Sequence, residues 1–278
     1  MTPPTSGATA RRMFGLVEPI GLIPYAADEP AEALLALGLR NYWDTYFAGR
    51  AAPLGRAPAE VVHAVFYNFA PGEAARHIPR VWDLITPDSA LAARQQGCVA
   101  ALRRILGDLA GAPGLARTAD LLTKAAISPP AIGRPLYAGL RALPLPEEPV
   151  ARLWHAANLL REHRGDGHVV ALVANGIGGT EAHVLLALSE GMPAEKFGRV
   201  SHLPQAQLAA VIDGMRARGL IGADGWLTAD GHATKQRIEA LTDDLAAPPY
   251  DGLELSELDQ LIAGLEPLAA ALAAVGSS

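Results

Sequence analysis

The densest group of ionisable residues in the chain is the stretch 161–168, which reads Arg-Glu-His-Arg-Gly-Asp-Gly-His. Six of its eight side chains can carry a charge. The stretch follows an apolar segment at 150–160 that is typical of a helix, and a second apolar helix is predicted over 169–175. Gly165 and Gly167 predict a turn between these two helices, because glycine allows the chain to reverse direction. We therefore expect the charged side chains of 161–168 to face a cleft.

The arginines of this stretch favour a pocket for a small anionic ligand. Arg161 and Arg164 can each bind a carboxylate or a phosphate through two parallel hydrogen bonds. We expect the pocket to lie between the two halves of the chain. Glu18 precedes Pro19, at which a helix over 8–17 is expected to break. The other residues predicted to bind the ligand are Glu18, Arg50, His155, Asp166 and Glu181.

Glu162, His163 and His168 offer a second interpretation, an enzyme that uses acid–base groups or a divalent metal as cofactor. Imidazole and carboxylate groups bind divalent ions, and histidine titrates near neutral pH. His155, His163 and His168 are the candidate metal ligands, although they lack a recognised spacing such as HExxH. The third interpretation is structural, a solvated helix junction in which Asp166 caps the helix that starts near His168. The residues alone leave all three interpretations open.

The composition of the chain limits its class. The 278 residues carry a formal net charge of −6, and 50% of them are hydrophobic. Ala and Leu dominate, which favours helices because these residues lose little freedom there. The single Cys98 excludes an internal disulfide framework and a cysteine zinc site. The sequence has neither an apolar signal segment nor a run of ~18 apolar residues, so we expect a cytoplasmic protein without a membrane partner.

The chain matches itself across a proline-rich boundary at 143–149. Residues that lie 136 positions apart agree at several places, for example Arg80 with Arg216. Closer to the N-terminus the offset drifts slightly, as small deletions would cause. We therefore predict a tandem duplication, with one unit at 8–142 and the other at 150–278.

The second unit has the order of elements of a winged helix. Helices are predicted over 180–189, 204–218 and 229–246 from their apolar periodicity. Asp224-Gly225 separates two short apolar runs ahead of the last helix, which is a strong hairpin signal. In the first unit the corresponding glycine is absent, and the wing is expected to be only a loop. The predicted fold class is mainly α, with duplicated winged-helix-like units and a small β-hairpin wing in the second.

Two groups of phrases resemble known families. Arg218–Ile221 followed by Trp226–Gly231 resembles the turn-and-wing phrase of MarR-type regulators. Longer phrases resemble an actinobacterial, SalK-like helix-turn-helix family: Tyr46–Gly55, Phe66–Phe69, Leu153–His155 and Leu160–His168. This resemblance implies a fold more than an activity, and it implies DNA binding only by analogy.

DNA recognition would fall to the predicted helix over 204–218. The N-terminal half of that helix offers Gln205 and Gln207, and glutamine can read adenine. Arg216 and Arg218 are among the few cations placed to neutralise phosphates, and the acidic net charge disfavours DNA as a partner. A homodimer, which the sequence leaves open, would double these contacts. We predict a small-ligand-binding regulator or accessory factor of actinobacterial metabolism, with an enzyme and a MarR-like DNA-binding regulator as alternatives.

Overall fold

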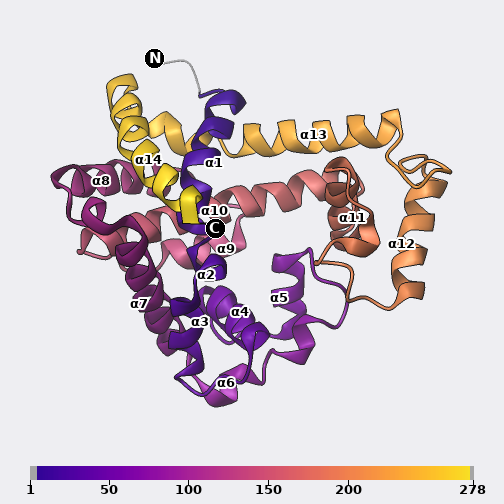
Figure 1. Cartoon of the computed structure of the whole chain (residues 1–278), viewed down its shortest axis with the longest axis horizontal. Coiled ribbons are helices and arrows are strands. Elements are labelled where there is room, and N and C mark those ends of the chain that lie inside the picture. Colours follow the sequence, from indigo (N-terminus) through magenta and orange to yellow (C-terminus); the bar gives the residue numbers. More distant parts are fainter. Residues whose placement is uncertain (1–4, 276–278) are drawn as a thin grey trace.

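The computed structural model describes residues 5–275, and helices dominate this part of the chain (Figure 1). The mainly α class predicted from composition is therefore confirmed. The described residues contain no strand, and five short 3-10 helices supplement the α-helices. The α-helices are α1 (Gly7–Gly21), α2 (Ile23–Ala26), α3 (Asp28–Leu35), α4 (Tyr42–Ala51), α5 (Ala59–Phe66), α6 (Val81–Leu84), α7 (Pro87–Leu106), α8 (Pro113–Ile127), α9 (Pro135–Arg141), α10 (Pro149–Ala174), α11 (Gly179–Ser189), α12 (Gln205–Ala217), α13 (Ala229–Leu245) and α14 (Leu255–Val275).

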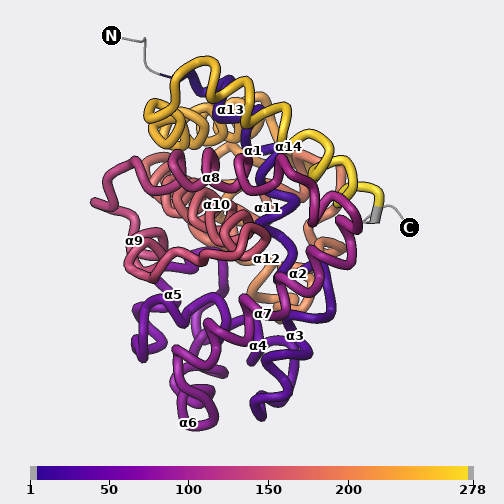
Figure 2. Tube along the Cα trace, turned by 90° about the vertical axis from the view of Figure 1, so that its left-hand side faces the viewer, coloured from indigo at the N-terminus to yellow at the C-terminus, as the bar shows by residue number. Residues whose placement is uncertain are grey.

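The longest helix, α10, is the axis around which the others are arranged. Figure 1 shows α10 and α13 running side by side, with α11 and α12 at one end of the pair. The side view in Figure 2 places α13 and α14 above α10, and α4 and α6 below it. Helices α1, α7, α8 and α9 also pack against α10. Residues from the middle of α10 can therefore meet side chains from distant parts of the sequence.

Helix α10 has clear start and stop signals, but it does not contain the predicted turn. Glu148 caps its first turn by accepting hydrogen bonds from two backbone N–H groups, and Gly176, with φ 66°, follows its last residues. Between these ends the helix runs unbroken through Gly165 and Gly167. The turn predicted there is wrong, because a glycine in a helix costs only about 1 kcal/mol relative to alanine. Burial of the apolar residues on both sides of the glycines outweighs that cost.

The helix break predicted at Pro19 is also wrong. Helix α1 continues to Gly21 with Pro19 in its last turn, and Ser6 caps its N-terminus. A proline this close to the end of a helix removes one backbone hydrogen bond and leaves the preceding turns intact. Glu18 consequently lies on a regular helix face and projects toward α10.

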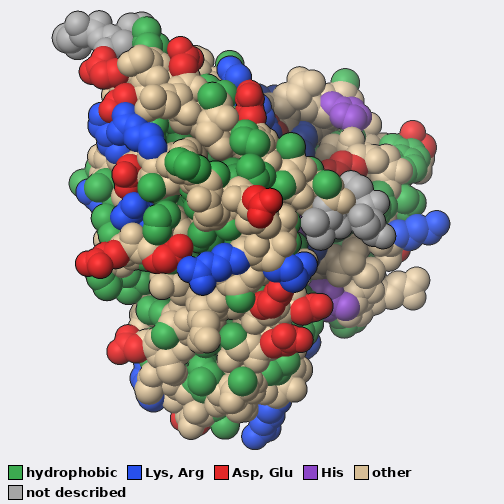
Figure 3. Space-filling view, turned by 60° about the vertical axis from the view of Figure 1, so that its left-hand side comes forward, with side chains coloured by type: hydrophobic (Ala, Val, Ile, Leu, Met, Phe, Trp, Pro, Cys, Tyr) green, Lys and Arg blue, Asp and Glu red, His purple; other side chains and the backbone are tan. Residues whose placement is uncertain are grey.

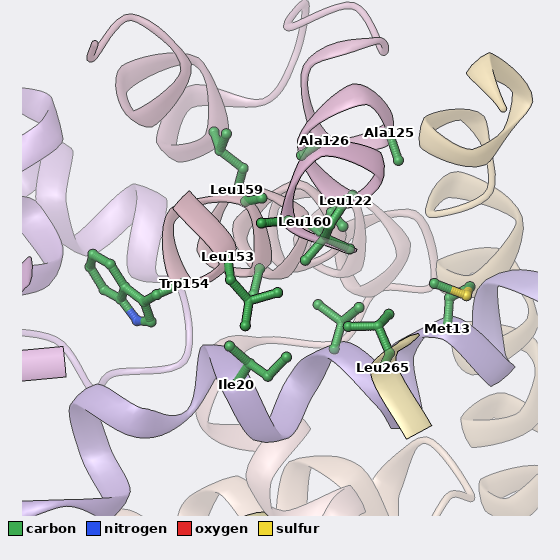
Figure 4. Close-up of a cluster of buried hydrophobic side chains, with 14 of the residues drawn as sticks. Met13, Ile20, Leu122, Ala125, Ala126, Leu153, Trp154, Leu159, Leu160 and Leu265 are labelled. Carbon is green, nitrogen blue, oxygen red and sulfur yellow. The ribbon is translucent and has the colours of Figure 1, made fainter. Parts of the chain in front are cut away.

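The main hydrophobic core is built from both predicted halves of the chain. Figure 4 shows Leu153 and Leu160 of α10 among side chains from α1, α8 and α14, including Leu265. Helix α1 packs on α14, whereas α10 packs on α8. The main core therefore contains residues from both sides of the proline-rich segment at 143–149. Two smaller cores adjoin it, one around α4 to α7 and the other around α11, α12 and α13.

The predicted wing and duplication differ from the structure. Residues 220–228 form a tight turn in which Ile221 and Leu227 make a single antiparallel bridge, so the expected two-stranded hairpin is absent from the described residues. The stretch 69–81, which the offset of 136 aligns with α12, contains a 3-10 turn and the start of α6. Two equal winged-helix units are therefore not supported, because the sequence match extends over residues that fold differently.

No single described helix is long and apolar enough to cross a membrane.

Close packing of α3 on α7 yields a stability prediction. A Cβ atom at Gly97 of α7 would lie 2.4 Å from the Cα atom of Pro30 and 2.6 Å from the backbone oxygen of Glu29. Since backbone atoms cannot move aside locally, Gly97→Ala is expected to lower the free energy of unfolding by about 1–3 kcal/mol. Urea denaturation of both proteins measures this difference.

Gly15 provides the matched control, because a Cβ there meets no atom within 4 Å and the residue is also helical. Gly15→Ala is expected to raise the free energy of unfolding by about 0.5–1 kcal/mol through helix propensity. Equal stabilities of the two variants would contradict the close approach of α3 and α7.

Candidate functional site

A cavity of about 210 Å³ lies where α10 passes α1, α4, α5 and α11. Its wall is rich in both charge and aromatic surface. The charged and polar residues of the lining are Glu18, Arg50, Asn68, Arg161, Glu162, Arg164, Asp166, His168, His183 and Arg199. The aromatic residues are Phe14, Tyr46, Phe66 and Phe69.

Glu162 is the centre of the ion pairs at this cavity. Its side chain is only 2% exposed, and both of its oxygens are bound by arginine. Arg50 donates from Nε to Oε1 at 3.2 Å and from Nη2 to Oε2 at 2.9 Å, while Arg161 Nη1 donates to Oε1 at 2.9 Å. Burial by itself raises the pKa of Glu162, but the charges of Arg50 and Arg161 prevail and lower it to about 2. Glu162 is therefore a carboxylate at neutral pH.

Arg161 joins this centre to α1. Its Nε donates to Glu18 Oε1 at 3.2 Å, whereas the buried Oε2 of Glu18 has no partner in the described residues. Burial raises the pKa of Glu18 more than Arg161 lowers it, so the charged form of Glu18 is disfavoured. Arg94 lies deeper, 3% exposed, and donates to the Tyr25 hydroxyl at 3.1 Å. No carboxylate among residues 5–275 pairs with Arg94.

Aromatic rings hold the guanidinium groups in place along the wall. The Arg164 guanidinium lies 4.1 Å from the ring centre of Phe14, and that of Arg50 lies 4.4 Å from the ring centre of Phe66. Arginine over an aromatic face is attracted to the ring, and the attraction grows as water is excluded. These contacts keep the cations at the cavity surface and limit their side-chain motion.

Tyr46 brings a hydroxyl into the same group of arginines. Arg50 Nη1 donates to this hydroxyl at 3.3 Å, and the Arg199 guanidinium lies 5.9 Å from the ring centre. Burial raises the pKa of Tyr46, but the charges of Arg50, Arg199 and Arg161 outweigh burial and the net effect is a lowered pKa. A lowered phenol pKa indicates a positive potential at this end of the cavity.

The C-terminal half of α10 contributes Asp166 and His168, whose pKa values are shifted by burial in favour of their neutral forms. Asp166 accepts a hydrogen bond from the backbone N–H of Tyr137 at 2.9 Å, and burial raises its pKa to about 6. Burial lowers the pKa of His168 to about 4, so its imidazole is neutral at pH 7. Thr242 donates its hydroxyl proton to a backbone carbonyl, which makes His168 Nδ1 the donor in their 2.9 Å contact. The Nε2 atom of His168 therefore carries a lone pair.

The structure brings most of the predicted site residues together around this cavity. Those that line it are Glu18, Arg50, Arg161, Glu162, Arg164, Asp166 and His168. Arg164 also pairs with Asp243 of α13 at 3.0 Å, which ties the cavity wall to a second long helix. The cavity is thus formed by one uninterrupted stretch of α10 together with α1, α4, α5 and α11.

Three predicted site residues lie elsewhere. His155 is two helical turns before Glu162 and is buried, with Nε2 unpartnered. His163 packs edge-on against Tyr137, with ring centres 5.0 Å apart. Glu181 accepts a hydrogen bond from Gly178 N at 2.8 Å at the start of α11. The candidate metal ligands His155, His163 and His168 do not converge, and residues 5–275 contain no group of three or more His, Cys, Asp or Glu suited to a metal ion.

Several cavity residues were not predicted from the sequence. They are Phe14, Tyr46, Phe66, Asn68, Phe69, His183 and Arg199. The phrases at 46–55 and 66–69 had indicated family-specific residues, but aromatic residues at helical spacing are also typical of a core. Their exposure to the cavity depends on how α1, α4, α5 and the region of α11 pack against α10, which no local pattern reveals.

The predicted DNA-contacting residues lie on or next to α12, where the positive charges are largely neutralised. Gln205 is exposed and Gln207 is half-buried. Arg216 pairs with Asp213, and Arg218 pairs with Glu181. On the face shown in Figure 3, acidic and basic side chains are interspersed over the surface. Electrostatic attraction to phosphates is accordingly weak for these residues.

The buried ion pairs lead to a prediction about acid stability. Glu162→Gln leaves Arg50 and Arg161 without their shared carboxylate and is expected to lower the free energy of unfolding by about 3–5 kcal/mol. The folded pKa of about 2 lies below the ordinary value, so Glu162 stabilises the fold above the unfolded pKa and loses this effect as pH falls toward 2. Urea denaturation between pH 2 and pH 7 should show a shallower dependence on pH for the variant.

The matched control is Glu60→Gln, at an exposed position in the first turn of α5. It is expected to change the free energy of unfolding by less than about 0.5 kcal/mol. Identical pH profiles for wild type and Glu162→Gln would show that Glu162 is not held as a buried carboxylate.

Comparison with known proteins assigns the chain to a family. A model of a helix-turn-helix family matches residues 10–278, which include the cavity as well as α11 and α12. Neither a curated protein nor a solved structure matches the chain. The chain therefore belongs to this helix-turn-helix family.

Proposed function

We propose that this protein is a ligand-responsive helix-turn-helix regulator that binds a small organic anion in the cavity beside α10. The observation that carries the proposal is the composition of the cavity wall. Four arginines line it, against three carboxyl groups. Arg50 and Arg161 share the charge of Glu162, Arg161 also pairs with Glu18, and Arg164 pairs with Asp243. Arg199 is thus the lining arginine that has no carboxylate partner in the described residues. An anion would supply the missing negative charge.

The aromatic part of the wall restricts the kind of anion. Phe14 and Phe66 already present one face each to Arg164 and Arg50, and Phe69 and Tyr46 complete an apolar surface. Pockets with apolar walls and a few placed charges bind ligands that carry both features. A planar aromatic carboxylate fits this wall better than inorganic phosphate, which would leave the rings uncovered.

The position of the cavity supports a regulatory role. His183 belongs to α11, and Arg199 lies in the connection between α11 and α12. A ligand that binds Arg199 competes with the contact between Arg199 and Tyr46, and so acts on the segment that positions α12. Ligand binding and DNA binding would be coupled through this segment, since a ligand shifts an equilibrium only by its different affinity for two states.

The finer family resemblances point in the same direction. The phrases shared with MarR-type regulators surround the tight turn after α12, and those shared with the SalK-like family include the residues 160–168 of α10. We infer that α12 faces DNA in the regulator and that Gln205 is its leading base-contacting residue. The acidic net charge and the paired Arg216 and Arg218 support only a modest affinity for DNA, because few phosphates would be neutralised.

An enzyme is the second candidate, and it rests on Asp166. This carboxyl group lines the cavity with a pKa of about 6, so it gains and loses a proton near neutral pH. The neutral His168 lies in the same wall. Glu162 suits this role less well, because two arginines hold it as a weakly basic carboxylate. An acid–base mechanism would accordingly use Asp166 and His168, with Glu162 as an electrostatic support.

Two naphthalene probes test the proposed anion site. 2-Naphthoate and 2-naphthamide share one ring system, and only the first carries a negative charge. We expect 2-naphthoate to bind at least about tenfold more tightly in isothermal titration calorimetry, because hydrogen bonds to charged groups contribute about 1.5–3 kcal/mol. Arg199→Gln should remove most of this preference, whereas Arg56→Gln, at an exposed position outside the cavity, should preserve it. Equal affinity for the two probes would refute an anion site.

The regulatory half of the proposal has its own test. Binding to a labelled duplex from the region upstream of the protein's own gene is measured by fluorescence anisotropy at about 50 mM and 200 mM salt. We expect binding at the lower salt, a loss at the higher salt, and at least a threefold change in affinity when 2-naphthoate is added. Gln205→Ala should weaken DNA binding and leave calorimetric binding of 2-naphthoate unchanged. Absence of DNA binding at low salt would refute the proposed regulatory role, but it would not affect the proposed anion site.

A further inference from the structure

A second cavity, also of about 210 Å³, lies beside Phe69. Phe69 is in the lining of both cavities, so the two cavities adjoin at this residue. The wall of the second cavity is aromatic on one side, where Trp43 and Phe47 of α4 accompany Phe69. The polar side includes His77 and His202, which come from distant parts of the chain. The proposed anion site uses none of these polar groups.

His77 is held by a fully buried carboxylate. Asp44 is 0% exposed, and its Oδ1 lies 2.7 Å from His77 Nδ1 and 2.6 Å from Arg80 Nη2. Burial raises the pKa of Asp44, but the hydrogen bonds from His77 and Arg80 outweigh burial and lower it. Asp44 is therefore ionised and only accepts hydrogen bonds, so the proton of the His77 pair lies on Nδ1. Arg80 and His77 thus both contact the same oxygen of Asp44.

The ring of His77 has one defined orientation. It stacks on Phe47 with ring centres 4.8 Å apart and an interplanar angle of 11°. With Nδ1 directed to Asp44 and the ring plane fixed by Phe47, Nε2 points to the other side of the ring. Nε2 has no hydrogen-bond partner among residues 5–275, and His77 lines the cavity. A neutral imidazole with a protonated Nδ1 presents a lone pair at Nε2.

The remaining charges of this cavity are largely balanced. His202 Nε2 lies 2.5 Å from Glu73 Oε1, which also joins the connection before α12 to the first half of the chain. Arg76 is exposed at the rim. The lining thus offers aromatic faces and the oriented Nε2 atom of His77, while the oxygens of Glu73 are already bound by His202 and by the backbone N–H of Ala70. The group of buried arginines that distinguishes the first cavity is not part of this lining.

We propose that the second cavity binds an uncharged planar aromatic molecule that donates a hydrogen bond to His77 Nε2. The donor is a phenolic O–H or a ring N–H. Aromatic rings pack against the faces of Trp43 and Phe69 in offset or edge-to-face geometry. The buried Asp44 and the stacked Phe47 keep the acceptor in place before the ligand arrives, which reduces the entropy lost on binding.

A matched pair of neutral probes tests this site in the full-length protein. 2-Naphthol and 2-methoxynaphthalene share the ring system, but only 2-naphthol has an O–H to donate. We expect 2-naphthol to bind about tenfold more tightly at neutral pH, since a satisfied hydrogen bond in a buried site contributes on the order of 1 kcal/mol and an unsatisfied acceptor adds a penalty. In protein labelled with ¹⁵N-histidine, 2-naphthol should shift the Nε2 resonance of His77 and 2-methoxynaphthalene should not.

Three variants test whether the difference in affinity between the two probes arises at His77. His77→Phe keeps an aromatic ring on Phe47 and removes the acceptor, so the two probes should bind with equal affinity. Trp43→Leu, at a side chain that is 41% exposed, should weaken both probes alike. Arg199→Gln in the first cavity should change neither. Circular dichroism verifies folding, and the resonance test on the unaltered protein does not depend on it. Equal affinities for the two probes, or an unmoved His77 resonance, would overturn the proposal, whatever the outcome for 2-naphthoate.

Discussion

The arrangement of this protein depends on a carboxylate that is buried in the middle of a long helix. Glu162 would cost several kcal/mol to bury without partners, and two arginines remove that cost only if their geometry is good. Arg50 binds it from α4 with two parallel hydrogen bonds, and Arg161 binds it from the preceding position of α10. This requirement fixes the distance between α4 and α10. These side chains line the cavity, and they are too polar to pack into an apolar core without partners.

The sequence predicted the bounds of several helices better than it predicted the contacts between residues far apart in the chain. The helices over 180–189, 204–218 and 229–246 agree closely with α11, α12 and α13, because their caps and apolar periodicity are local signals. The charged stretch at 161–168 was identified as the centre of a site, and five of its side chains line the cavity. The predicted turn at Gly165 failed because local propensity carried no information about the helices that cover α10.

The contacts that could not be predicted are those between residues far apart in the chain. Arg50 and Glu162 are separated by 112 positions, and Asp44 and His77 by 33. A single sequence does not indicate which of its distant residues contact each other. The side of α10 on which His163 lies, facing Tyr137, follows from the same long-range packing. Membership of a helix-turn-helix family is consistent with α11 and α12, but the family alone does not explain why their cations are paired with carboxylates of the same chain.

The packing of α1 against α14 affects how the chain folds during its synthesis on the ribosome. Met13 and Ile20 of α1 are completely buried, and Leu265 of α14 belongs to the same core. Because synthesis proceeds from the N-terminus, the apolar face of α1 emerges long before the helix that completes its cover. Non-local contacts of this kind slow folding and leave hydrophobic surface exposed during translation. The nascent chain should therefore depend on chaperone protection until α14 has left the exit tunnel.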